Sequence, residues 1–248
     1  MNAEIKQALS KVPEVTLGFW IIKILATTFG ETAGDAVSMS MNLGYLLGTV
    51  IFLALFITAV IAQIKVNQFH PSLYWATIII STTVGTTLAD FADRSLGIGY
   101  LGGSLLLLTT LFMWHNSLGA IDVGSVAMPK AEAFYWLTIM FSQTLGTALG
   151  DWTADSAGLG YVGAAYIFSA GLCLIVGAYY FTKISRTPLF WLAFVLTRPL
   201  GAVVGDFLDK PIAEGGLEFS RYTATVVLLV AIIILIIVIP QRAATKSH

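Results

Sequence analysis

The sequence is short of charged residues, cysteine and histidine, and each shortage excludes a class of protein. Charged residues make up 11% of the chain, whereas soluble domains carry about 25%. The one cysteine cannot form an intrachain disulfide. The three histidines are scattered, so a zinc or copper centre is not expected. A net charge of −1 and the absence of a basic tract argue against nucleic acid as a partner.

The chain is instead rich in apolar segments whose length matches the thickness of a membrane. Hydrophobic residues make up 57% of its 248 residues, and about 20 consecutive apolar residues form one transmembrane helix. We therefore expect an all-α, multi-pass protein of the lipid bilayer, with one transmembrane domain over residues 1–248 and no cleavable signal peptide. The expected spans are roughly 16–36, 45–65, 74–92, 99–119, 134–153, 160–182, 189–207 and 221–239.

A repeat runs through the sequence, and its phase is set by Trp20, Trp75, Trp136 and Trp191. An aspartate follows each tryptophan by fifteen residues, giving Asp35, Asp90, Asp151 and Asp206. A glycine follows each tryptophan by ten residues, giving Gly30, Gly85, Gly146 and Gly201. These shared offsets indicate four tandem copies of one unit, with bounds of about 15–66, 70–120, 131–183 and 186–240.

Each unit contains two expected helices, and this determines how the copies are related. Because a pair of helices returns the chain to the side it started from, all four units enter the membrane from the same side. We expect eight transmembrane helices from four parallel repeats, pseudo-symmetric about an axis along the membrane normal. Small residues four positions apart, such as Gly30 and Gly34, would let helices pack closely within one chain or between copies in a homo-oligomer.

The basic residues predict the orientation of the chain. Three of them, Arg94, Lys210 and Arg221, fall on the side opposite the termini. The eight on the same side as the termini are Lys6, Lys11, Lys65, Lys130, Lys183, Arg186, Arg242 and Lys246. The positive-inside rule therefore predicts that both termini are cytoplasmic. The repeat tryptophans would then form an aromatic belt at the cytoplasmic interface.

Ten of the fourteen acidic residues fall toward the outer end of the expected bundle. They are Glu31, Asp35, Asp90, Asp93, Asp151, Asp155, Asp206, Asp209, Glu214 and Glu218. Carboxylates within a membrane cost roughly 2.5–3.5 kcal/mol each and generally mark ion or proton pathways. Hard divalent cations such as Mn²⁺, Mg²⁺ and Ca²⁺ prefer oxygen ligands. We expect such a cation to be bound by the four repeat aspartates, Asp35, Asp90, Asp151 and Asp206.

Other charged residues would extend this candidate site. The acids three or four positions from a repeat aspartate, and so on its helix face, are Glu31, Asp93, Asp155 and Asp209. Lys23 and Arg198 lie within expected spans, each eight residues before an acid, and we expect them to be internal counter-ions. Lys23 could instead extend to the cytoplasmic surface. The aspartates could instead cap loops or accept hydrogen bonds from backbone amides.

At these residues the sequence resembles a bacterial membrane-protein family made of four tandem copies of a repeat of unknown function. The resemblance covers roughly residues 15–240 and rests on the four tryptophans and the Gly-Asp steps ending at Asp35, Asp151 and Asp206. It implies two transmembrane segments per copy and a place in the bacterial inner (plasma) membrane, but no activity. The sequence departs from the pattern at Ala89 and at Arg198-Pro199, where copies one and two have paired threonines.

Several functions remain open from the sequence. The leading hypothesis is a secondary transporter of a hard divalent cation, with Mn²⁺ or Mg²⁺ favoured as substrate and export slightly favoured over import. We expect coupling to protons, because crowded carboxylates can exchange protons for a metal ion. A second is a proton-driven carrier of a small organic cation, with Trp152 and Tyr161 as aromatic walls. A third is a structural membrane protein. We expect no cofactor and no enzyme, because a hydrolase needs one asymmetric pair of aspartates rather than four similar ones.

Overall fold

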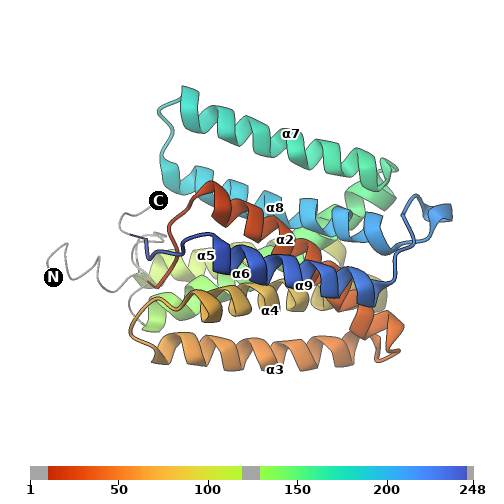
Figure 1. Ribbon diagram of the computed structural model, residues 1–248, viewed down its shortest axis with the longest axis horizontal. Helices are drawn as coiled ribbons and strands as arrows, with labels where there is room; N and C mark the ends of the chain where they lie inside the picture. The colour runs from red at the N-terminus through yellow and green to blue at the C-terminus, as the bar shows by residue number, and fades with distance from the viewer. Residues whose placement is uncertain (1–10, 119–128, 245–248) are drawn as a thin grey trace, which may run out of the picture.

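The computed structural model describes residues 11–118 and 129–244, and its long elements in these ranges are all α-helices (Figure 1). They are α2 (Leu17–Asp35), α3 (Gly44–Lys65), α4 (Pro71–Asp90), α5 (Gly99–Leu118), α6 (Pro129–Asp151), α7 (Gly160–Phe181), α8 (Arg186–Asp209) and α9 (Arg221–Val238). Each bound lies within five residues of the expected span, so the all-helical prediction is confirmed. Lys6 and Lys246, used to predict the orientation, lie outside the described residues.

The repeat aspartates mark the points where three of the helices change geometry. A π-helical turn begins immediately after Asp35, Asp90 and Asp151, over Ala36–Ser40, Phe91–Ser95 and Trp152–Ser156. Wider turns of this kind are frequent at functional sites. The fourth copy differs, because α8 continues three residues beyond Asp206 and is followed by a short 3₁₀ turn, Ile212–Glu214.

The first helices of the four repeats form a closed inner ring. Helix α2 packs against α4, α4 against α6, α6 against α8, and α8 against α2. The second helices lie outside this ring, each mainly against the first helix of the next repeat. Thus α3 packs on α4, α5 on α6, α7 on α8, and α9 on α2; Figure 1 shows α7 and α3 on opposite flanks of the molecule.

Glycines at one repeat position allow the inner helices to approach closely. A Cβ on Gly30 would clash with Thr82 of the next inner helix, and a Cβ on Gly85 would clash with Gln143. The same relation holds for Gly146 with Arg198 and for Gly201 with Thr27. Small residues commonly permit such close packing of apolar helices. The absence of a side chain at the glycines ten residues after each tryptophan therefore allows neighbouring inner helices to pack in direct contact.

Aromatic side chains close the ring at the end where the inner helices begin. Each aromatic residue before a repeat tryptophan contacts the tryptophan of a neighbouring repeat, in the pairs Phe19–Trp75, Tyr74–Trp136, Tyr135–Trp191 and Phe190–Trp20. Trp75 and Trp136 are 0% and 2% exposed. Trp75 and Trp136 therefore face neighbouring rings inside the bundle rather than a surface, whereas Trp20 and Trp191 are partly exposed.

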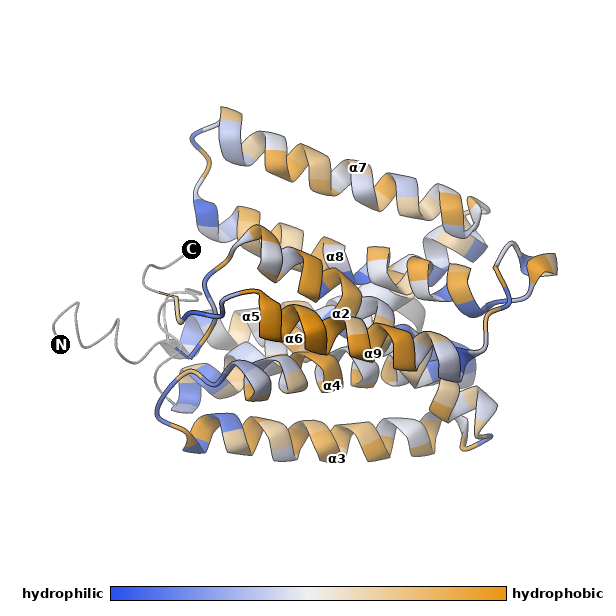
Figure 2. Cartoon of the chain, viewed as in Figure 1, coloured by the Kyte–Doolittle hydropathy of each residue, from blue (hydrophilic) through white to orange (hydrophobic). Residues whose placement is uncertain are grey.

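The outer helices present apolar side chains to their surroundings. Four helices of the described chain, α3, α7, α8 and α9, are long and apolar enough to cross a membrane. Figure 2 shows hydrophobic residues along most of α3 and α9, and hydrophilic residues gathered in the links at the helix ends. Helices α2, α4 and α6 carry more polar residues, and most of those are buried in the ring. The polar residues of these inner helices are thus mostly buried, while the outer helices expose apolar residues.

Candidate functional site

Arg198 lies at the centre of the inner ring. Its Nη2 lies within hydrogen-bond distance of Glu31 Oε2 at 2.8 Å, of Thr86 Oγ1 at 2.6 Å and of Thr147 Oγ1. These three partners lie on α2, α4 and α6, whereas Arg198 lies on α8. The side chain of Arg198 is completely buried. One guanidinium group therefore connects all four inner helices and fills the middle of the bundle.

The four repeat aspartates lie beyond Arg198, at the end of the inner ring opposite the aromatic residues. Asp35, Asp90 and Asp151 are the last residues of α2, α4 and α6, and Asp206 lies in the last turn of α8. Asp35, Asp90 and Asp206 are at most 4% exposed, while Asp151 is partly buried. The four carboxylates thus lie at one acidic end, but no metal-sized group of described carboxylates contains all four, and Asp90 belongs to none.

Two groups of three carboxylates come close enough together to hold a metal ion. Glu31, Asp151 and Asp206 form the first group, and Asp35, Asp206 and Asp209 form the second. Within each group, one oxygen from each residue lies within 4.8 Å of the others. Oxygen ligands in this arrangement suit a hard divalent cation. Asp206 belongs to both groups and links them.

Basic side chains accompany the second group. Lys210 Nζ lies 2.6 Å from Asp35 Oδ2 and 3.1 Å from Asp206 Oδ1, and Arg221 Nε lies 3.2 Å from Asp209 Oδ2. Burial disfavours the charged form of Lys210, but the negative charges of Asp206, Asp35 and Asp209 outweigh it and raise the pKa of Lys210 above its usual value. Lys210 therefore remains an ammonium ion at neutral pH.

The acidic end has more carboxylates than basic groups. Arg94 Nε lies 2.9 Å from Asp90 Oδ1, whereas Asp151 has no ion pair within 4 Å among the described residues. The cluster comprises the carboxylates of Glu31, Asp35, Asp90, Asp151, Asp206 and Asp209 and the basic groups of Arg94, Arg198, Lys210 and Arg221. With every group ionised, six carboxylates against four basic groups leave two negative charges uncompensated.

Three of the predicted site residues form no ion pair with this cluster. Asp93 and Asp155 are exposed, and Asp155 lines the cavity described below. Lys23 is completely buried, and its Nζ lies 4.2 Å from the centre of the Phe194 ring with no hydrogen-bond partner in the described structure. Lys23 therefore neither reaches the surface nor contacts a described carboxylate, and only Arg198 of the two predicted counter-ions forms an ion pair with the cluster.

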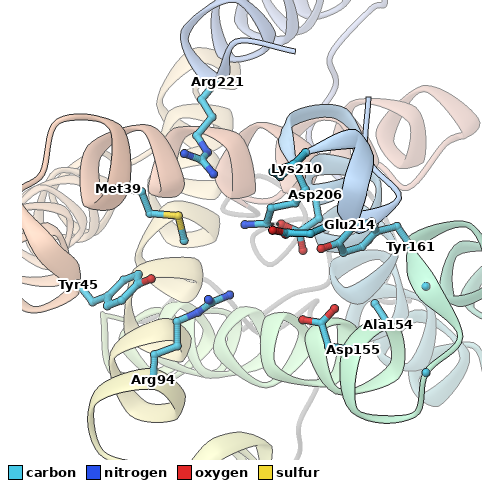
Figure 3. Close-up of a pocket in the computed structure, with 13 residues that line it drawn as sticks. Met39, Tyr45, Arg94, Ala154, Asp155, Tyr161, Asp206, Lys210, Glu214 and Arg221 are labelled. Atoms are coloured by element: carbon cyan, nitrogen blue, oxygen red, sulfur yellow. Dashed lines mark ion pairs between the residues drawn. The ribbon is translucent and has the colours of Figure 1, made fainter. Parts of the chain in front are cut away.

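A cavity of about 670 Å³ opens at the acidic end. Its lining includes Asp206, Lys210, Arg94 and Arg221 together with Asp155. Figure 3 shows Arg94 and Arg221 reaching toward it from opposite sides, with Asp206 and Lys210 grouped on a third. The charged cluster is therefore open to a space large enough for a hydrated ion or a small organic molecule.

The sequence-based reasoning missed Lys210, Arg94 and Arg221 as partners of the carboxylates. For two of them a local signal exists, because Lys210 follows Asp206 by four residues and Arg94 follows Asp90 by four, which is the spacing of ion pairs along a helix. Arg221 carries no such signal, because it reaches Asp209 from the start of another helix, α9.

Together, the fold and the acidic end define a tandem-repeat helical protein with membrane-like helices. The family model of a Repeat of Unknown Function (DUF347) matches residues 18–69, 73–115, 134–185 and 189–241. The chain therefore belongs to this repeat family, and the resemblance recognised in the sequence is confirmed. No curated protein and no solved structure matches the chain.

Proposed function

We propose that all eight long helices span a membrane, as four parallel repeats related by an axis along the membrane normal. The cyclic packing of α2, α4, α6 and α8 supports this arrangement. So does the inward burial of the polar residues of α2, α4 and α6, because polar groups in a bilayer must face the protein interior. Both termini lie in the cytoplasm of a bacterial cell, and the acidic end faces outward.

The function that best fits the acidic end is transport of a hard divalent cation, with Mn²⁺ or Mg²⁺ favoured. The observation that carries this proposal is the pair of three-carboxylate groups linked by Asp206. Such a site lacks the nitrogen and sulfur ligands that softer metals prefer. The cation moves between the two groups through Asp206, which is a member of each.

Protons are the natural coupling ion. One divalent cation or two protons would neutralise the same excess of two negative charges, so each can replace the other without a net change of charge. Metal binding to carboxylates generally competes with protonation. An exporter could therefore release its cation into the outward cavity as external protons take its place, and export is the direction we favour.

The test is cation flux in proteoliposomes that contain the full-length protein. We expect Mn²⁺ uptake driven by a proton gradient, abolished in Asp151→Asn and Asp206→Asn. The matched control is Asp93→Asn, an exposed aspartate that should leave flux unchanged. Absence of flux in the wild-type protein, with Mn²⁺ still bound, would favour a structural protein whose acids hold the bundle together.

A second candidate is a proton-driven carrier of a small organic cation. The cavity of about 670 Å³ is larger than a bare metal ion requires. Of the two predicted aromatic walls, Tyr161 lines it and Trp152 does not, and Tyr45 and Met39 are further lining residues. Aromatic faces commonly bind organic ammonium groups. In the same proteoliposomes, a quaternary amine that is transported while Mn²⁺ is not would select this function.

A further inference from the structure

Lys210 pairs with two of the three carboxylates in the second group. Its ammonium lies between Asp35 and Asp206, two of the three members of that group, at 2.6 and 3.1 Å. The third member, Asp209, pairs with Arg221 at 3.2 Å. The group is therefore already supplied with positive charge from the chain itself.

This internal pairing leaves part of the group unsatisfied. Asp35 Oδ1 and Asp209 Oδ1 are buried and lack a hydrogen-bond partner in the described structure, in residues that are 1% and 6% exposed. Buried polar atoms are nearly always bonded, because leaving them unpaired costs free energy. A metal ion accepts several oxygen ligands at once, so it can engage oxygens that one ammonium group leaves free.

The side chain of Lys210 can leave the group without moving its backbone. The backbone is fixed by two hydrogen bonds, from Lys210 N to Asp206 O at 2.8 Å and from Glu218 N to Lys210 O at 2.9 Å. The ammonium is carried on a flexible four-carbon stem. Lys210 also lines the open cavity, which offers its displaced ammonium access to water.

We propose that Lys210 is a tethered cation that holds the Asp35–Asp206–Asp209 group in place of the substrate and is displaced into the cavity when a divalent cation binds. The proposal rests on the cation-binding part of the function above and does not require transport. A built-in competitor of this kind lowers the affinity for the cation. It also refills the group after the cation leaves, so that buried carboxylates are not left uncompensated.

The direct test is chemical labelling of Lys210 in the purified full-length protein, with and without Mn²⁺. An amine-acetylating reagent at neutral pH should label Lys210 weakly without metal, because its ammonium is buried and paired. Saturating Mn²⁺ should raise the labelling of Lys210 several-fold, as read by mass spectrometry. Lys183, which is exposed, serves as the internal control and should be labelled equally in both conditions. Unchanged labelling of Lys210 while Mn²⁺ binds would overturn the proposal.

A pair of variants separates competition from a general effect of charge. Lys210→Met should tighten Mn²⁺ binding about tenfold or more, because a hydrogen bond to a charged group generally contributes that much. Arg94→Met also removes one positive charge from the cavity lining, but from the partner of Asp90, and should have a clearly smaller effect. Equal effects of the two variants would contradict a specific role for Lys210.

The outcomes distinguish this inference from the proposed transport. Increased labelling of Lys210 with Mn²⁺, but no flux in proteoliposomes, would leave the inference standing and refute transport. Flux with unchanged labelling of Lys210 would support transport and refute the tethered-cation inference. Failure of both the wild-type protein and Lys210→Met to bind Mn²⁺ would refute the tethered-cation inference. The labelling experiment uses the wild-type chain, so it gives an answer even where Lys210→Met does not fold.

Discussion

Two basic side chains are completely buried in the bundle, and their surroundings differ. Arg198 bonds Glu31 and two threonine hydroxyls through Nη2. The ammonium of Lys23 lies over the face of Phe194 and has no hydrogen-bond partner among the described residues. A buried charge is tolerated when it is paired and hydrogen-bonded, and is costly when it is not. Removing the carboxylate partner of Arg198 should therefore lower the free energy of unfolding. Removing the ammonium of Lys23 should raise it.

Glu31→Gln should destabilise the protein. The substitution keeps the size of the side chain but leaves the guanidinium of Arg198 buried without its carboxylate, which generally costs about 3–5 kcal/mol. Denaturant unfolding of the purified protein in detergent measures the change, with Asp93→Asn as the exposed control. An unfolding free energy equal to that of the wild type would show that Arg198 does not depend on Glu31.

Lys23→Met should stabilise the protein. Methionine has a similar length and no polar group to bury, and removing an unbonded buried polar group generally gains about 1–3 kcal/mol. The aligned positions in the second and third repeats, Ile78 and Ile139, are already apolar and fully buried. The same unfolding experiment should show the gain, and a loss of stability would mean that Lys23 has a partner in the folded protein.

At the scale of the helices, close approach around the ring is the main constraint. A Cβ on Gly85 would meet the side chain and the backbone of Gln143, and the backbone nitrogen of Thr144. Backbone atoms cannot move aside as a flexible side chain can, so the two inner helices would have to separate. No such limit applies at Gly177 in the outer helix α7, where a Cβ would meet nothing within 4 Å.

Gly85→Ala and Gly177→Ala therefore form a matched pair. Gly85→Ala should lower the unfolding free energy by about 1–3 kcal/mol, as overpacking of a tight interface generally does. Gly177→Ala should leave it unchanged or raise it by up to about 1 kcal/mol, because alanine is the better helix former. Thermal denaturation followed by circular dichroism distinguishes the two, and equal effects would contradict the close ring.

The repeat made the aspartates and the close-packing glycines predictable, because each follows the tryptophan at a fixed offset; the ring of first helices was seen only in the structure. The burial of Trp75 and Trp136 was not predictable, because a tryptophan near a helix end is typical both of an interface and of packing between helices. The pairing of Asp35 with Lys210 joins residues 175 positions apart. No local spacing indicates such a contact, so the charge balance of the site required the three-dimensional structure.

As a whole, the molecule is asymmetric along the axis of the ring. At one end of the described structure, aromatic rings of neighbouring repeats contact one another, and Lys11 forms a buried ion pair with Glu132 at 2.7 Å. The other end carries the carboxylates and the cavity. A cation can therefore reach the carboxylates through the cavity without any rearrangement of the aromatic end. Binding at the acidic end can be measured directly on the purified protein.

Binding of Mn²⁺ should weaken as the pH falls. The carboxylates bind metal when ionised, so protonation competes with the cation, and about two protons should be released per cation bound when the empty site is protonated. Calorimetric titrations in buffers of different ionisation enthalpy measure this number. An affinity independent of pH, with no proton release, would contradict exchange of protons for metal at these carboxylates.

The central claim is that the carboxylates at the end of the inner ring bind a hard divalent cation. The most direct measurement is equilibrium binding of Mn²⁺ to the purified wild-type protein and to the Asp206→Asn and Asp93→Asn variants. We expect saturable binding to the wild type and to Asp93→Asn, and a loss of at least about tenfold in affinity in Asp206→Asn, which removes the ligand shared by both groups. Equal binding by all three proteins, or none by the wild type, would contradict it.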